Sequence, residues 1–185
     1  MGSPRKDGNT SILLQEAIRG VGESGHEVKI FNLARMKIRP CRNCGGCDKT
    51  GICIIEGDAM GGIYAALRAA DRIILASPIF FAGLSAQSKA MVDRCQAFWC
   101  EKYLLNKPLP EGPDGRKGLF ITVGGMKTGK GVECGGATAT AFFRTLSVPV
   151  HASLGYRGVD AKGAIKEHPT ALQEAFEAGR ELVRI

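Results

Sequence analysis

The chain has 185 residues, of which 44% are hydrophobic and 23% are charged, and its formal net charge is +7. This composition is ordinary for a soluble globular protein, and the length allows one domain with its own hydrophobic core. The longest apolar runs are broken by Pro78 and Gly83, which argues against a membrane partner. The basic residues form no block, which argues against a nucleic-acid partner.

The first residues, MGSPRKDGNT, are polar and lack the apolar stretch of a secretory signal. We therefore expect a cytoplasmic location, where disulfides are rare. The seven cysteines are also an odd number, which excludes a complete intrachain disulfide framework.

Helical and strand patterns alternate along the chain. Apolar residues at helical spacing predict a helix over residues 10–25, and an alternating pattern predicts a strand over 26–33. A cysteine-rich loop at 41–53 comes next. The remaining predicted elements, in chain order, are a helix at 58–71, a strand at 72–77, a helix at 85–100, a strand at 117–125, a helix at 133–147, a strand at 149–156 and a helix at 168–185.

This order of elements predicts a single α/β domain over residues 1–185 with a doubly wound parallel sheet, in which ligands bind beyond the carboxyl ends of the strands. The stretch GSPRKDGNTS, residues 2–11, has the character of a phosphate loop between a strand and a helix. Only Met1 and Gly2 stand before Ser3, so we expect the usual first strand to be missing. Either the chain as printed begins downstream of that strand, or the sheet has four strands instead of five.

Four of the seven cysteines lie in the spacing C-x2-C-x2-C-x5-C. They are Cys41, Cys44, Cys47 and Cys53. Two-residue spacings bring consecutive thiolates round one small inorganic cluster, and the fourth cysteine lets a single loop supply a complete ligand set. Structural zinc sites usually pair two C-x2-C knuckles across a longer insert, and a thioredoxin-like pair leaves Cys47 and Cys53 without a role. The spacing therefore favours a [4Fe–4S] cluster over zinc.

The other cysteines are scattered downstream. We expect Cys95, Cys100 and Cys134 to behave as small buried apolar residues.

Two further loops follow predicted strands, ASPIFFAG at 76–83 and VGGMKTG at 123–129. Phe80 and Phe81 beside a polar loop are side chains that can hold a flat ring system, although either one alone is better explained as part of the core. The loop at 2–11 lacks a Walker ending and is also consistent with an ordinary polar helix start.

Taken in this order, the segments GSPRKDGNTS, CRNCGGCDKTGIC, ASPIFFAGLSAQSKAMVDR and VGGMKTG resemble the iron–sulfur flavoproteins of the NADPH-dependent FMN reductase-like, flavodoxin-fold group. The resemblance covers nearly the whole chain. It implies FMN at the C-terminal edge of a parallel sheet and a [4Fe–4S] cluster in the cysteine loop.

The resemblance also implies roles for individual residues. The FMN phosphate would be held by Ser3, Arg5, Asn9, Thr10 and Ser11. The flavin ring and ribityl chain would be lined by Pro78, Ile79, Phe80, Phe81 and Gly83. Gly124 and Gly125 would form the third flavin loop, and the iron ligands would be Cys41, Cys44, Cys47 and Cys53.

We therefore expect an FMN- and [4Fe–4S]-containing oxidoreductase that relays electrons between a donor and an acceptor. A small redox carrier or a nicotinamide such as NADPH would be its partner, and a homodimer or homotetramer its assembly. No protein side chain is assigned as a catalytic acid or base. One alternative is an NAD(P)H-dependent FMN or quinone reductase with a secondary cluster, and another is a zinc-stabilised binding module without enzymatic activity.

Overall fold

The computed structural model describes every residue of the chain except 24 and 185. Its helices are α1 (Asn9–Gly22), α2 (Met60–Ala69), α3 (Ala86–Arg94), α4 (Gln96–Trp99), α5 (Lys130–Thr145) and α6 (Ala171–Leu182), and its strands are β1 (Arg72–Phe80), β2 (Gly83–Leu84), β3 (Lys117–Gly124) and β4 (Val150–Arg157). Short helical turns span Leu33–Arg35, Cys100–Leu104 and Ala164–Glu167. No helix in the described part of the chain combines the length and apolarity that a bilayer span requires.

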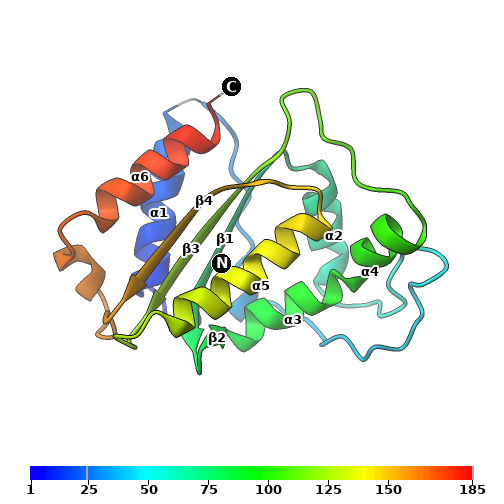
Figure 1. Ribbon diagram of the computed structural model, residues 1–185, viewed down its shortest axis with the longest axis horizontal. Coiled ribbons are helices and arrows are strands. Elements are labelled where there is room, and N and C mark those ends of the chain that lie inside the picture. The colour runs from blue at the N-terminus through cyan, green and yellow to red at the C-terminus, as the bar shows by residue number, and fades with distance from the viewer. Residues whose placement is uncertain (24, 185) are drawn as a thin grey trace.

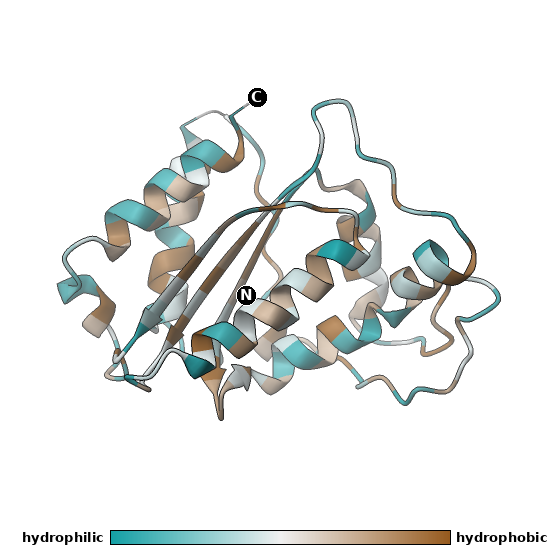
Figure 2. Cartoon of the chain, viewed as in Figure 1, coloured by the Kyte–Doolittle hydropathy of each residue, from teal (hydrophilic) through white to brown (hydrophobic). Residues whose placement is uncertain are grey.

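The four strands form one sheet in the order β2-β1-β3-β4. β1, β3 and β4 are parallel, with Ala76 opposite Ile121, whereas the two-residue β2 folds back antiparallel on the end of β1. Residues 73–79 of β1 and 118–124 of β3 are mostly buried, as expected for parallel strands covered on both faces. Figure 2 shows this apolar centre of the sheet in brown. The predicted α/β fold with a mostly parallel four-strand sheet is confirmed.

Helices cover both faces of the sheet (Figure 1). α1 and α6 pack with one face, around Leu13, Leu119 and Ile121. α2, α3 and α5 pack with the other face, around Met60, Met91, Phe120 and Phe143 and their neighbours. α1 and α6 lie so close together that a Cβ on Gly179 of α6 would come within 2.0 Å of the Ala17 carbonyl oxygen of α1, so the packing requires glycine there.

The predicted strand at 26–33 is wrong: this segment is irregular and ends in a short helical turn. In the flavodoxin-like strand order the second strand pairs with the first, and among the described residues no strand precedes this segment, so it has no ladder partner. Met1 and Gly2 occupy the place of that strand. The Met1 amine donates to Phe31 O at 2.8 Å, Leu33 N donates to Met1 O at 2.9 Å, and Gly2 N donates to Ala76 O at 2.8 Å.

A cavity of about 740 Å³ continues from Met1 between segment 26–31 and residues 72–75 of β1. We call it the strand slot. Its wall is largely apolar and includes Ile30, Phe31, Ile73 and Leu75. Burial at its end lowers the pKa of the Met1 amine to about 6. The slot is therefore an apolar space beside a sheet edge, with a desolvated amine where a strand's peptide group would lie.

We expect an extension of five valine residues before Met1 to raise the free energy of unfolding by about 2 kcal/mol. Apolar residues line both faces of the slot, so all five side chains would be buried and would outweigh the entropy of ordering the segment. Urea denaturation measures this. A serine–glycine extension of the same length is the control and leaves stability unchanged. Equal stability of the two extended proteins would contradict the description of the slot.

Candidate functional site

The four clustered cysteines line one small cavity of about 20 Å³, together with Arg94 and Gln96. Cys41, Cys47 and Cys53 are partly buried and Cys44 is exposed. The structure thus brings together all four thiols that the spacing predicts as ligands. All four are free, as are Cys95, Cys100 and Cys134.

Tight turns shape the cysteine loop. Asp48 N donates to Gly45 O at 3.1 Å and Gly51 N donates to Cys47 O at 2.8 Å. Gly51 has a φ of +68°, and a Cβ there would lie 2.9 Å from the Cβ of Glu101, so glycine is required on both counts. The backbone N–H of Asn43 donates to the Cys41 sulfur at 3.5 Å. Such N–H···S bonds stabilise a thiolate ligand.

Cys100 is a fifth thiol at this loop, and the cysteine spacing did not predict its position there. Its sulfur lies 3.6 Å from the Cys47 sulfur and 3.4 Å from Asp48 Oδ1, and Gln96 Nε2 donates to it at 3.7 Å. Burial raises the pKa of Cys100 to about 12 and also raises the pKa of Cys47. Cys100 is buried as predicted, whereas Cys134 is exposed and that prediction is wrong.

A buried ion pair closes the loop at its base. Arg94 Nη1 donates to Asp58 Oδ2 at 2.7 Å, and the two side chains are at most 1% exposed. Burial raises the pKa of Asp58, but hydrogen bonds from Arg39 N, Arg94 and Met60 N outweigh it and hold that pKa below its usual value. In the sequence, Arg94 shares one face of a predicted helix with the apolar residues Met91 and Phe98. A charged residue on a buried apolar face needs a buried counter-charge, so this spacing is the signal that could have revealed the ion pair.

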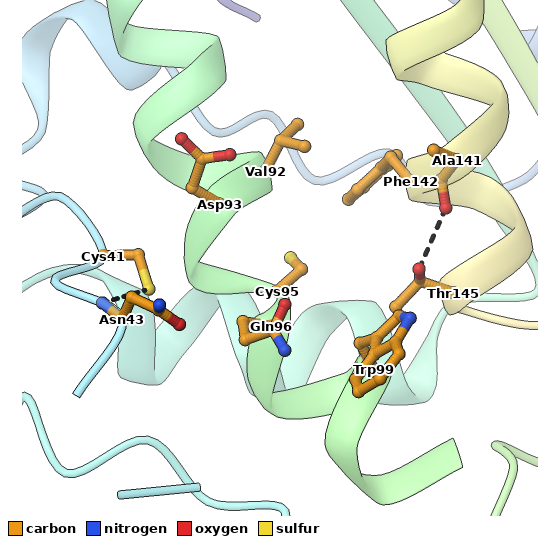
Figure 3. A pocket seen from close by; sticks show the side chains of 10 residues that line it. All are labelled: Cys41, Asn43, Val92, Asp93, Cys95, Gln96, Trp99, Ala141, Phe142 and Thr145. Atoms are coloured by element: carbon orange, nitrogen blue, oxygen red, sulfur yellow. Dashed lines mark hydrogen bonds between the residues drawn. The ribbon is translucent and has the colours of Figure 1, made fainter. Parts of the chain in front are cut away.

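A groove of about 350 Å³ opens beside the cysteine loop, between α3, α4 and α5. Figure 3 shows Cys41 and Asn43 on one side of it and Phe142 and Thr145 on the other, with Gln96 and Trp99 between them. Trp99 is partly exposed. The Cys41 side of the loop therefore faces a surface groove with aromatic walls.

A second group of predicted residues lies at the carboxyl edge of the sheet, where α1 begins (Figure 1). Ser3 and Thr10 are buried, and Arg5 is exposed. Asn9 already uses its amide: Nδ2 donates to Ala161 O at 2.9 Å and Oδ1 accepts from Ile165 N at 3.3 Å. Both contacts tie the first loop to the segment that follows β4.

The end of β1 carries the predicted aromatic loop. Phe80 and Phe81 are exposed, and Phe81 adopts a φ of +48° at the tip of the β1–β2 hairpin. Such a conformation is uncommon for a bulky residue and is concentrated at functional sites. Ser85, which follows the hairpin, donates from its hydroxyl to Gly2 O at 2.7 Å and so joins the aromatic loop to the first loop.

The third predicted loop closes the same edge. A Cβ on Gly124 would lie 3.1 Å from Ile79 Cβ, and a Cβ on Gly125 would lie 3.0 Å from Asp160 Cβ. Arg5 Nη1 donates to Asp160 O at 3.0 Å. The first and third loops therefore meet through Asp160, and all three predicted flavin loops share one edge of the sheet.

Residues 1–154 match the family model described as NADPH-dependent FMN reductase. An iron–sulfur flavoprotein of Methanocaldococcus jannaschii is 40% identical over 106 residues, which are 57% of this chain and 54% of that protein. One from Archaeoglobus fulgidus is 38% identical over 128 residues, covering 69% of this chain and 61% of that protein. This chain thus spans between half and two thirds of the length of these two relatives.

Solved structures agree on the fold. An NAD(P)H:quinone oxidoreductase from Methanothermobacter marburgensis superposes with a TM-score of 0.68 at 18% identity, covering 99% of this chain and 94% of that one. An NADH:FMN oxidoreductase in its apo form gives a TM-score of 0.60 at 18% identity, covering 97% and 85%. At 18% identity these two similarities support the fold alone.

Asp58→Asn should flatten the acid dependence of stability. Because the folded pKa of Asp58 is below the unfolded value of about 3.9, its contribution is present above that value and is lost as the pH falls through the folded pKa. The substitution should also cost about 3 kcal/mol at pH 7, since it leaves Arg94 without its buried counter-charge. Urea denaturation between pH 7 and pH 3 measures both effects.

Asp93→Asn is the matched control, because Asp93 pairs with Lys89 in the open, with its side chain 43% exposed. It should change stability by less than about 1 kcal/mol. An acid dependence in Asp58→Asn as steep as in the unmodified protein would contradict the assigned pKa direction.

Proposed function

The chain belongs to the NADPH-dependent FMN reductase family, and we propose that it is a flavin-dependent oxidoreductase that relays electrons between a donor and an acceptor through FMN and a [4Fe–4S] cluster. The observation that carries the proposal is the convergence of Cys41, Cys44, Cys47 and Cys53 on one cavity. When bound, FMN supplies two-electron chemistry and the cluster supplies one-electron chemistry.

The cysteine loop fits such a cluster by the chemistry of its donors. Four thiols on tight turns supply a complete ligand set, and the Asn43 amide near the Cys41 sulfur adds an N–H···S bond. Exposure of Cys44 leaves a path for electrons to reach the surface. Zinc remains the competing occupant of four thiols, and metal analysis separates the two.

The sheet edge fits FMN. The amino end of the 14-residue α1 favours a phosphate, and the hydroxyls of Ser3, Thr10 and Ser11 with the Arg5 guanidinium lie on or before its first turn. Asn9 would act by holding the loop in shape. The ring and ribityl chain would lie along Pro78, Ile79, Phe80, Phe81 and Gly83. Gly124 and Gly125 would form the third flavin loop, which packs closely on Ile79 and Asp160.

The two cofactor positions lie at opposite ends of α3. Ser85 at its amino end contacts the flavin loops, and Arg94 at its carboxyl end lines the cysteine cavity. Nine helical residues separate these ends by about 13 Å. The resemblance to iron–sulfur flavoproteins suggests a homodimer or homotetramer that brings one subunit's flavin near a neighbour's cluster, and the exposed Phe81 is compatible with such an interface. The external partner would be a small redox carrier or a nicotinamide donor, and a reducing compartment such as the cytoplasm would keep the cysteines as thiols.

Replacing one cysteine ligand tests the proposal. Cys44→Ser, purified without oxygen, should lose most of its iron, its sulfide and its broad visible absorbance, and should retain FMN, because the flavin loops lie at the other end of α3. Cys134→Ser removes an exposed thiol on α5 and should leave both cofactors in place. Iron, sulfide and flavin assays with a visible spectrum measure this. Equal iron in the two variants, or zinc in place of iron, would refute the cluster.

A further inference from the structure

Arg94 forms part of the wall of the cavity that the four cysteines share. The residue is 1% exposed and lies at the carboxyl end of α3. A guanidinium remains charged at all relevant pH values, so this is a fixed positive charge under the cysteine loop. Its partner Asp58 contacts one side of the group.

Two guanidinium nitrogens hold the two ends of the cysteine loop. Nη1 donates to Arg39 O at 2.9 Å, just before Cys41, and Nη2 donates to Ile55 O at 2.8 Å, just after Cys53. One side chain therefore closes the loop that carries all four thiols. The same residue's carbonyl accepts from Tyr64 Oη at 2.8 Å, and Arg94 and Cys53 line the same small cavity.

The third nitrogen, Nε, is buried and has no hydrogen-bond partner among the described residues. A buried N–H on a charged group is costly to leave unpaired, so such a group usually has a partner. The other nitrogens of Arg94 have good oxygen acceptors, which makes Nε the exception within a well-satisfied group.

We propose that Arg94 is a positioning residue that donates its Nε–H to a sulfur of the cluster site, with the Cys53 thiolate as acceptor, and thereby raises the reduction potential. The inference rests on the proposed function, because the Cys53 sulfur is a cluster ligand only when the metal is bound. A charge-assisted N–H···S bond strengthens when the cluster gains an electron and becomes more anionic. The guanidinium therefore favours the reduced state, and Asp58 partly offsets its charge.

Arg94→Lys tests this, because lysine keeps the charge but lacks the planar fork that reaches both carbonyls, Asp58 and the sulfur together. Arg116→Lys is the matched control. Arg116 is also buried, at 4% exposure, and donates to the carbonyls of Leu67, Ala70 and Leu146. Both variants should lose stability, and only Arg94→Lys should change the cluster.

Redox titration followed by electron paramagnetic resonance is the readout, with iron content measured on each protein. Arg94→Lys should lower the midpoint potential by about 59 mV, which is a tenfold change for a one-electron couple. Arg116→Lys should leave it unchanged. Full iron content with an unmoved potential in Arg94→Lys would overturn the inference, whereas absence of iron from the unmodified protein would instead overturn the proposed function.

If Arg94→Lys does not fold, the Asp58→Asn variant tests whether the Arg94 charge raises the reduction potential of the cluster. Removing the carboxylate leaves the Arg94 charge less compensated, so the potential should rise. An unchanged or lowered potential in Asp58→Asn with full iron would count against Arg94 acting on the cluster.

Discussion

The buried pair of Arg94 and Asp58 is the interaction on which the cysteine loop depends. Their 2.7 Å contact joins the carboxyl end of α3 to the segment that follows the loop, and bonds from Arg94 to the carbonyls of Arg39 and Ile55 close the loop at both ends. Truncating one partner of a buried pair typically costs several kcal/mol, because the other charge is left uncompensated. A long irregular segment is thereby given a fixed shape without helix or strand.

Helix α3 links this loop to the opposite end of the molecule. Ser85 at its amino end ties the hairpin that carries Phe80 and Phe81 to the first loop of the chain. The parallel sheet brings the three predicted flavin loops to one edge, since the carboxyl ends of β1 and β3 must lie together. The architecture thus presents two chemically different sites, one based on backbone and hydroxyl groups and one on thiols, at the two ends of one helix.

Much of the fold follows from the sequence, because the buried strands and amphipathic helices have strong periodic patterns. The segment 26–33 has an equally good strand pattern, yet it forms no strand, because pairing depends on a neighbour and not on the segment's own residues. The convergence of the four clustered cysteines on one cavity was predictable from local spacing. The contacts of Cys100 and Arg94 were not, because each reaches across at least 36 residues to the loop, and only tertiary packing makes such contacts.

We propose that one chain holds a flavin at the sheet edge and an iron–sulfur cluster in the cysteine loop. The decisive experiment is purification under anaerobic conditions, followed by a visible spectrum and assays of flavin, iron and sulfide. We expect one FMN per chain, with iron and acid-labile sulfide in equal amounts. A colourless protein that contains zinc and neither iron nor flavin would contradict it.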